Sequence, residues 1–145
     1  MTAGVVIKSA DRRSQTAATE NIDIRDAIEA DLPVIVEIHN AAIATRISTA
    51  QLEPVTVEGR REWFRMHSPV QYPLWVAELD GDIAGWLSFR EFLPRCAYCG
   101  TVEISVYVSE KFRRRGIGRK LLRQAIAGGS AARHAFPRRP DFQPK

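Results

Sequence analysis

The stretch that decides the fold is T-V-E-I-S-V-Y-V at residues 101–108, followed by R-R-R-G-I-G-R-K-L-L at residues 113–122. Successive side chains of a strand point to opposite faces. The valines and isoleucine of the first run therefore share an apolar face, whereas Glu103, Ser105 and Tyr107 share the other. A polar row on an internal strand predicts a cleft, and the alternative is an edge strand with one solvent-exposed face.

The second run predicts an anion-binding turn at the start of a helix. Gly116 and Gly118 let backbone amides approach a ligand, because no Cβ stands in the way. Free N–H groups at a helix start bind phosphate oxygens, and the arginines around them add positive charge. The spacing R-x-x-G-x-G is neither a P-loop nor the three-glycine dinucleotide fingerprint. The alternative is a solvated, basic helix start.

Working outward, the pattern predicts a first strand, two helices, a hairpin and a last helix. Asp31 is a candidate N-cap for the first helix, with Pro33 in its first turn. Asp80-Gly81 is a signal for a two-residue hairpin turn. The expected elements are a strand at 22–25, a helix from Leu32 to Ala42, a helix from Thr56 to Met66 with Trp63 and Phe64 toward the core, strands at 74–79, 83–89 and 101–108, and a helix whose apolar face holds Ile117, Leu121, Leu122 and Ala125.

The chain has 145 residues, 45% of them apolar, which fits one domain. Residues 1–20 show no clear period and are interpreted as a disordered leader. Residues 21–127 form the expected domain. Residues 128–145 are rich in Pro, Gly, Ala and Arg, a composition typical of a disordered basic tail. No membrane span or signal peptide is recognisable, so we expect a cytoplasmic protein without a membrane partner.

Charge is distributed unevenly along the chain. Residues 1–110 hold 10 Lys/Arg and 16 Asp/Glu, whereas residues 111–145 hold 11 Lys/Arg and only Asp141. This local excess of positive charge predicts a bound anion. Nucleic-acid binding is a further alternative, although no binding module is recognisable. Cys96 and Cys99 lack matching ligand spacing, so we expect two ordinary thiols and no metal.

These motifs resemble the acetyl-CoA core of the GCN5-related N-acetyltransferases (GNAT). The similarity is greater to one branch, the phosphinothricin and methionine sulfoximine acetyltransferases. Further runs support that branch and extend the resemblance over about residues 22–126: I-R-D-A-I-E-A-D-L-P, I-H-N-A-A-I-A-T-R, L-E-P-V-T, E-W-F, W-V-A-E-L-D-G and P-R-C-A-Y. The resemblance implies an α/β fold, with a mixed, mostly antiparallel sheet flanked by helices.

The resemblance also implies roles for residues. Strand backbone would pair with the pantetheine arm of acetyl-CoA, and amides of the basic turn would hold its pyrophosphate. Glu103 matches the usual general base, since a substrate ammonium must lose a proton before its nitrogen attacks the thioester. The residues assigned to acetyl-CoA in this way are Val106, Tyr107, Val108, Arg113, Arg114, Arg115, Gly116, Ile117, Gly118 and Arg119.

The acceptors of this branch are small amino acids that carry a phosphinate or sulfoximine group. Arg95 matches an arginine near the acceptor site, and Tyr98 is a candidate pocket wall. Trp75 is a second candidate pocket wall, and Arg46 and Arg90 are weaker candidates to bind the carboxylate of the acceptor. For all of these residues, a surface arginine or a core aromatic is the alternative interpretation. From these acceptors we expect a small-molecule amine as substrate. The resembling enzymes commonly form homodimers, so a homodimer is also considered.

The resemblance ends close to Ile126. The family continues with a fifth strand, and acetyl-CoA lies between its fourth and fifth strands; the sequence after Ile126 shows no such strand. We hypothesise a truncation or a frameshift, tested by reading the coding DNA beyond codon 126 in the other frames. The strand at 101–108 would then lose a neighbour and expose its edge. An inactive fragment with residual CoA binding is therefore the alternative function.

Overall fold

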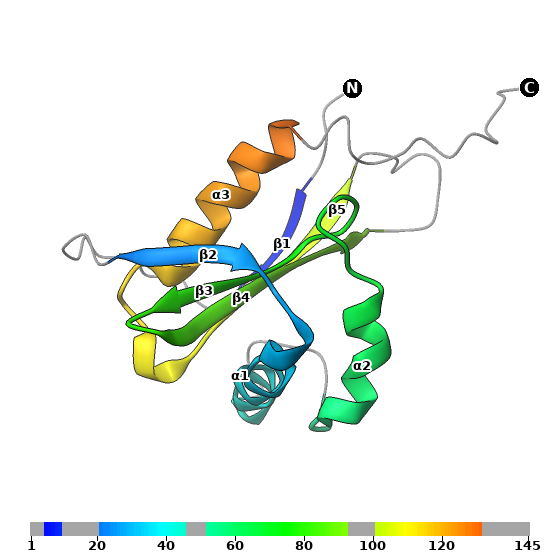
Figure 1. Cartoon of the computed structure of the whole chain (residues 1–145), viewed down its shortest axis with the longest axis vertical. Coiled ribbons are helices and arrows are strands. Elements are labelled where there is room, and N and C mark those ends of the chain that lie inside the picture. Colours follow the sequence, from blue (N-terminus) through cyan, green and yellow to red (C-terminus); the bar gives the residue numbers. More distant parts are fainter. Residues whose placement is uncertain (1–4, 10–20, 46–51, 93–100, 132–145) are drawn as a thin grey trace, which may run out of the picture.

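A computed structural model describes residues 5–9, 21–45, 52–92 and 101–131. Its elements form one sheet flanked by helices (Figure 1). In chain order they are β1 (Val5–Ser9), β2 (Ile22–Asp26), α1 (Leu32–Ala44), α2 (Val57–Arg65), β3 (Leu74–Leu79), β4 (Asp82–Glu91), β5 (Val102–Val108) and α3 (Ile117–Ala131), with short 3-10 turns at Glu29–Asp31 and Glu110–Phe112.

The sheet is mixed and mostly antiparallel, as predicted. Its strand order is β1-β5-β4-β3-β2. The three pairs from β2 to β5 are antiparallel, and the pair between β1 and β5 is parallel. Among the described residues, none of the helices has the length and apolar character needed to cross a membrane.

Local signals in the sequence account for the hairpin and for α2. Asp80 and Gly81 both have positive φ, 54° and 82°, as a tight hairpin turn between twisted strands requires. The side chain of Thr56 accepts a hydrogen bond from the N–H of Gly59 at 3.0 Å and so caps α2. Both elements therefore form where they were predicted.

Helices cover both faces of the sheet. On one face, α3 buries Ile117, Leu121 and Ala125 against the even-numbered residues of β5. On the other face, α1 and α2 pack over Trp86 and Tyr107. Figure 1 shows α3 on one side of the strands and α1 with α2 on the other. The strand β5 is therefore an internal strand with both faces covered.

An ion-pair network joins β2, β3 and the start of α1. The guanidinium of Arg25 donates to both carboxylate oxygens of Asp31, at 2.7 and 2.9 Å, and to Glu78 at 2.6 Å. Burial disfavours the charged form of Asp31, but hydrogen bonds from Arg25 and from the N–H of Ile28 outweigh it and lower the pKa of Asp31. Asp31 occupies the N-cap position of α1, yet its side chain makes these contacts and does not cap that helix.

Three expectations about the ends of the domain are wrong. The expected leader, residues 1–20, contains β1, because the β-branched run Val5–Ile7 finds a partner in β5. The strand β5 was expected to expose its second edge, but β1 pairs with that edge from Val102 to Val106. The helix α3 also extends to Ala131, past the change of composition after Ile126 and through Gly128 and Gly129, which disfavour a helix; Gly128 lies against Trp75 of β3. Residues 132–145 lie outside the described residues.

Candidate active site

Glu103 is a buried carboxylate near the start of β5. Its residue exposure is 4%, and its Oε2 accepts a hydrogen bond from Nη2 of Arg90 at 3.1 Å. These two residues lie directly opposite each other on β4 and β5. The alternative of an edge strand with one wet face is therefore wrong. The side chain of Arg90 is 61% exposed, so the ion pair lies at the margin between the covered sheet face and solvent.

Tyr107, on the same face as Glu103, belongs to an aromatic cluster. Its ring stacks on Trp86 with centroids 4.6 Å apart, and the ring of His39 from α1 meets it edge-on at 5.1 Å. Trp63 of α2 contacts Trp86 at 5.7 Å. The side chain of Tyr107 is therefore packed among aromatic rings. This cluster fixes α1 and α2 on the sheet.

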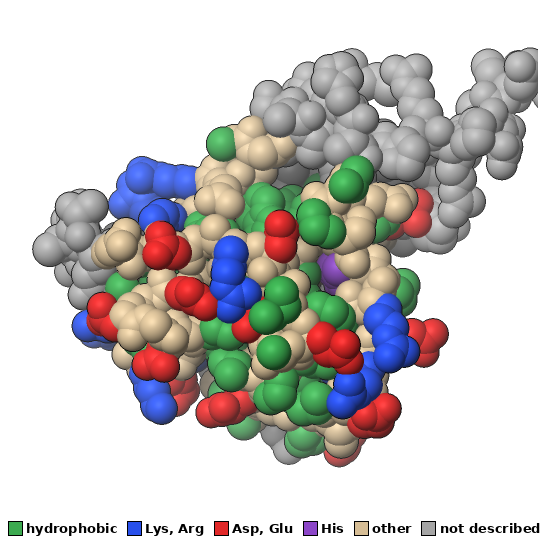
Figure 2. Space-filling model, viewed as in Figure 1, with side chains coloured by type: hydrophobic (Ala, Val, Ile, Leu, Met, Phe, Trp, Pro, Cys, Tyr) green, Lys and Arg blue, Asp and Glu red, His purple; other side chains and the backbone are tan. Residues whose placement is uncertain are grey.

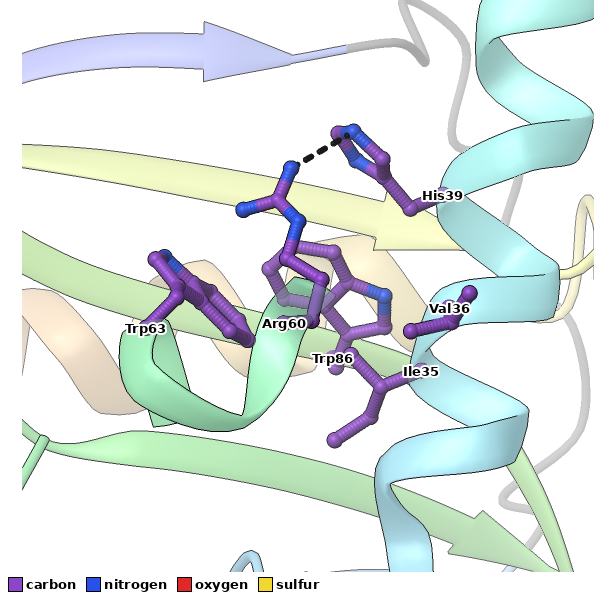
Figure 3. Close-up of a pocket in the computed structure, with 6 residues that line it drawn as sticks. All are labelled: Ile35, Val36, His39, Arg60, Trp63 and Trp86. Atoms are coloured by element: carbon purple, nitrogen blue, oxygen red, sulfur yellow. Dashed lines mark hydrogen bonds between the residues drawn. The ribbon is translucent and has the colours of Figure 1, made fainter. Parts of the chain in front are cut away.

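A basic side chain lies inside this cluster. Arg60 lies 4.9 Å from the centroid of Trp63, and its Nη2 is 3.0 Å from Nε2 of His39 (Figure 3). Because a guanidinium only donates, Nε2 of His39 is the acceptor. Burial lowers the pKa of Arg60 from its ordinary value, although a guanidinium keeps its proton in proteins. The shallow hollow here also involves Ile35 and Val36, and Nε1 of Trp86 is buried without a hydrogen-bond partner among the described residues.

The predicted anion-binding turn connects β5 to α3. Arg114 and Gly116 both have positive φ, 65° and 80°, a backbone pattern typical of concave anion-binding turns. The N–H of Lys120 donates to the carbonyl oxygen of Gly116, and the N–H groups before it have no acceptor within an α-helix. The side chains of Arg113, Arg114 and Arg119 are exposed beside these groups, and Arg115 lies 5.8 Å from the ring of Phe112. The turn therefore has the geometry and charge to hold an anion.

Gly85 and Gly118 both lie where α3 meets the sheet, but they differ in the space around them. A Cβ at Gly85 would lie 2.7 Å from the carbonyl oxygen of Tyr107 and 3.0 Å from Cγ2 of Ile117. Gly85 is therefore needed for the close packing of α3 on β4 and β5. A Cβ at Gly118 would meet only Val108, at 3.5 Å, and Val106, at 3.9 Å, which are ordinary contacts. Packing alone does not require a glycine at position 118.

Sequence reasoning missed Gly85, Arg60 and His39. An isolated glycine within an apolar strand is a signal of close backbone approach, and Gly85 could have been found in this way. His39 and Arg60 carried no such signal, because only the packing of α1 against α2 brings them together.

The predicted acceptor residues have mixed outcomes. Arg95, Tyr98, Arg46 and both cysteines lie outside the described residues. Trp75 packs on Phe89 at 5.1 Å and belongs to the α3 side of the sheet. It therefore lies on the face opposite Glu103, where the core-aromatic interpretation holds.

Charges on the face drawn in Figure 2 are of both signs. Acidic and basic side chains alternate there around an apolar area. Nucleic-acid binding generally depends on a clustered basic surface. This face of the described residues does not provide one.

Residues 35–137 match the family model of the acetyltransferase (GNAT) family. The chain therefore belongs to the GNAT family. The match includes β5, the basic turn and the whole of α3.

Individual relatives agree with this assignment. The chain is 45% identical to a Bacillus subtilis protein named "Putative phosphinothricin acetyltransferase YwnH", over 71% of this chain and 63% of that one. It is 38% identical to the L-methionine sulfoximine/L-methionine sulfone acetyltransferase of Pseudomonas aeruginosa, over 71% of this chain and 60% of that one. The chain thus spans less than two thirds of the length of these curated relatives.

Solved structures have the same fold. A phosphinothricin acetyltransferase of the GNAT superfamily from Sinorhizobium meliloti, solved in complex with acetyl-CoA, superimposes with a TM-score of 0.71 at 31% identity, over 76% of this chain and 60% of that one. An N-acetyltransferase from Staphylococcus aureus gives a TM-score of 0.72 at 34% identity, over 77% and 67%.

Proposed function

We propose that this protein is an N-acetyltransferase that uses acetyl-CoA to acetylate the amino group of a small amino-acid-like substrate. The observation that carries the proposal is the arrangement along β5. A buried carboxylate, Glu103, lies near its start, and the basic turn with α3 follows its end. The relatives named for phosphinothricin and methionine sulfoximine indicate the substrate class.

The cofactor would lie along the end of β5 and the start of α3. The N–H groups of residues 114–119 would hold the pyrophosphate, and the exposed arginines would neutralise its charge. The pantetheine arm would pair with the backbone of Tyr107 and Val108 as an added strand. We expected Val106 to take part as well, but that residue is paired with Ser9 of β1. Acetyl-CoA supplies a thioester whose carbonyl carbon is open to attack by an amine.

Glu103 would remove the proton that blocks the acceptor nitrogen. An ammonium has no lone pair, so it must lose a proton, to Glu103 directly or through a water, before the new C–N bond forms. The C–S bond would break as the carbonyl re-forms, and the departing CoA sulfur would take its electrons and the proton that the newly acylated nitrogen releases. Arg90 already donates to Glu103, so an acceptor that reaches this carboxylate has to share or displace that hydrogen bond.

A second candidate function is CoA binding without transfer. It is favoured by the 4% exposure of Glu103, which leaves little of this residue open to a substrate. The two functions share the basic turn and differ only in whether Glu103 is used.

Acetyl transfer to phosphinothricin and to methionine sulfoximine, followed by release of free CoA thiol, tests the proposal. We expect turnover with at least one of them, and a loss of about 100-fold or more in kcat for Glu103→Gln, with little change in acetyl-CoA affinity. Glu91→Gln, at the exposed end of β4, is the matched control and should keep wild-type kcat. Binding of acetyl-CoA without turnover on a panel of amino acids would instead favour the second candidate.

A further inference from the structure

The two edges of β5 are paired over different lengths. One edge pairs with β4 from Val102 to Val108. The other edge pairs with β1 only from Val102 to Val106, where Ser9 is the last partner. Among the described strands, β5 therefore lacks a neighbour on this edge only along Tyr107 and Val108, and Val108 presents its N–H and C=O there, because the carbonyl oxygen of Tyr107 lies toward Gly85 of β4.

This free edge lies beside the basic turn. The position that a Cβ would take at Gly118 is 3.5 Å from Cγ2 of Val108. Gly118 is in the first turn of α3, where N–H groups lack helical acceptors. Unpaired strand backbone and unpaired helix N–H groups are thus next to each other.

The paired part of β5 depends on β1. Val102, Glu103, Ile104 and Val106 are each 9% exposed or less, because helices cover both faces of the strand. Buried backbone N–H and C=O groups are costly unless they are paired. The five residues of β1 provide this pairing along one edge.

We propose that β1 borders the acetyl-CoA site and, by occupying part of the edge of β5, determines where on β5 the pantetheine arm can pair. This role rests on the proposed function. By pairing as far as Val106 and ending at Ser9, β1 leaves only the Tyr107–Val108 edge for the arm. Without β1, the edge of β5 is open along its whole length, so the arm has no fixed register and other strands can compete for the edge.

Deletion of residues 2–9 tests this role. Alternate N–H groups of β5 point toward β1 and toward β4. Hydrogen exchange should therefore become faster at the amides of Val102–Val106 that face β1, and stay slow at those that face β4. Acetyl-CoA, measured by calorimetric titration, should bind at least about tenfold more weakly.

Two proline variants replace the deletion if the shortened chain does not fold. Adjacent N–H groups of an edge strand point in opposite directions, so only one of Val6 and Ile7 donates to β5. Val6→Pro and Ile7→Pro are therefore matched controls for each other. One should weaken acetyl-CoA binding as the deletion does, and the other should bind like the wild-type chain. A synthetic peptide of residues 3–11 should restore binding to the deleted chain.

The possible results separate this role from the proposed function. A deleted chain that binds acetyl-CoA as tightly as the full chain, or more tightly, overturns the role of β1 alone. Two proline variants with equal affinity also overturn it. A full chain with slow exchange in β5 that fails to bind acetyl-CoA overturns the proposed function, and the role of β1 with it.

Discussion

Replacing Gly85 by alanine should disturb the junction between α3 and the sheet. The new Cβ would lie 2.7 Å from the carbonyl oxygen of Tyr107 and 3.0 Å from Cγ2 of Ile117. The oxygen belongs to the backbone of β5, which β4 holds in register, and Ile117 is 1% exposed. Neither neighbour can move without loosening other contacts.

Overpacking of this kind costs about 1–3 kcal/mol of unfolding free energy. At about 4 °C per kcal/mol, Gly85→Ala should lower Tm by roughly 4–12 °C. Calorimetry or circular dichroism during heating measures this shift. Equilibrium unfolding in urea should show a lower midpoint with an unchanged slope.

Gly118→Ala is the matched control. Its Cβ would make only ordinary contacts, so stability should stay within about 1 kcal/mol of wild type. The methyl group would, however, stand among the N–H groups proposed to hold pyrophosphate, and acetyl-CoA should bind at least about tenfold more weakly. A stable Gly85→Ala chain, or an unstable Gly118→Ala chain, would refute this account of the two glycines.

Three further predictions concern stability in acid and packing in the core. Burial lowers the pKa of His67, so stability should begin to fall as pH drops below about 6.5, and His67→Gln should remove this loss. The lowered pKa of Asp31 adds stability above about pH 3.8 that disappears as pH falls through its folded value; Asp31→Asn should abolish that second step in acid titrations. Leu121→Ala should lower the free energy of unfolding, measured in urea, by about 2–5 kcal/mol, because Leu121 is fully buried. Leu122→Ala should lower it clearly less, because Leu122 is only half-buried. Equal losses in the two variants would contradict the packing of α3.

Elements with strong local signals could be predicted from the sequence. The Asp80–Gly81 turn, the Thr56 cap and the alternation of β5 each depend on neighbouring residues, and each forms as expected. The turn between β5 and α3, with positive φ at Arg114 and Gly116, likewise follows from glycines and arginines close together in the chain, and its binding of an anion stays a prediction.

Features that depend on distant pairing could not be predicted. The run Val5–Ile7 is short, and its partner in β5 lies at the other end of the domain, so no local pattern indicates β1. The ion pair of Arg90 with Glu103 requires the register of β4 on β5. The burial of Glu103, which is 4% exposed, turns an expected open row into a covered one and depends on the packing of the whole sheet.

Thermal unfolding of the full chain with and without acetyl-CoA tests most directly whether this protein binds acetyl-CoA at the proposed site. Ligand at 100 times its Kd should stabilise the fold by about 2.7 kcal/mol, which would raise Tm clearly. Desulfo-CoA, which retains the pyrophosphate and most of the arm, should raise it as well. Cooperative unfolding at an unchanged Tm in both titrations would contradict the account.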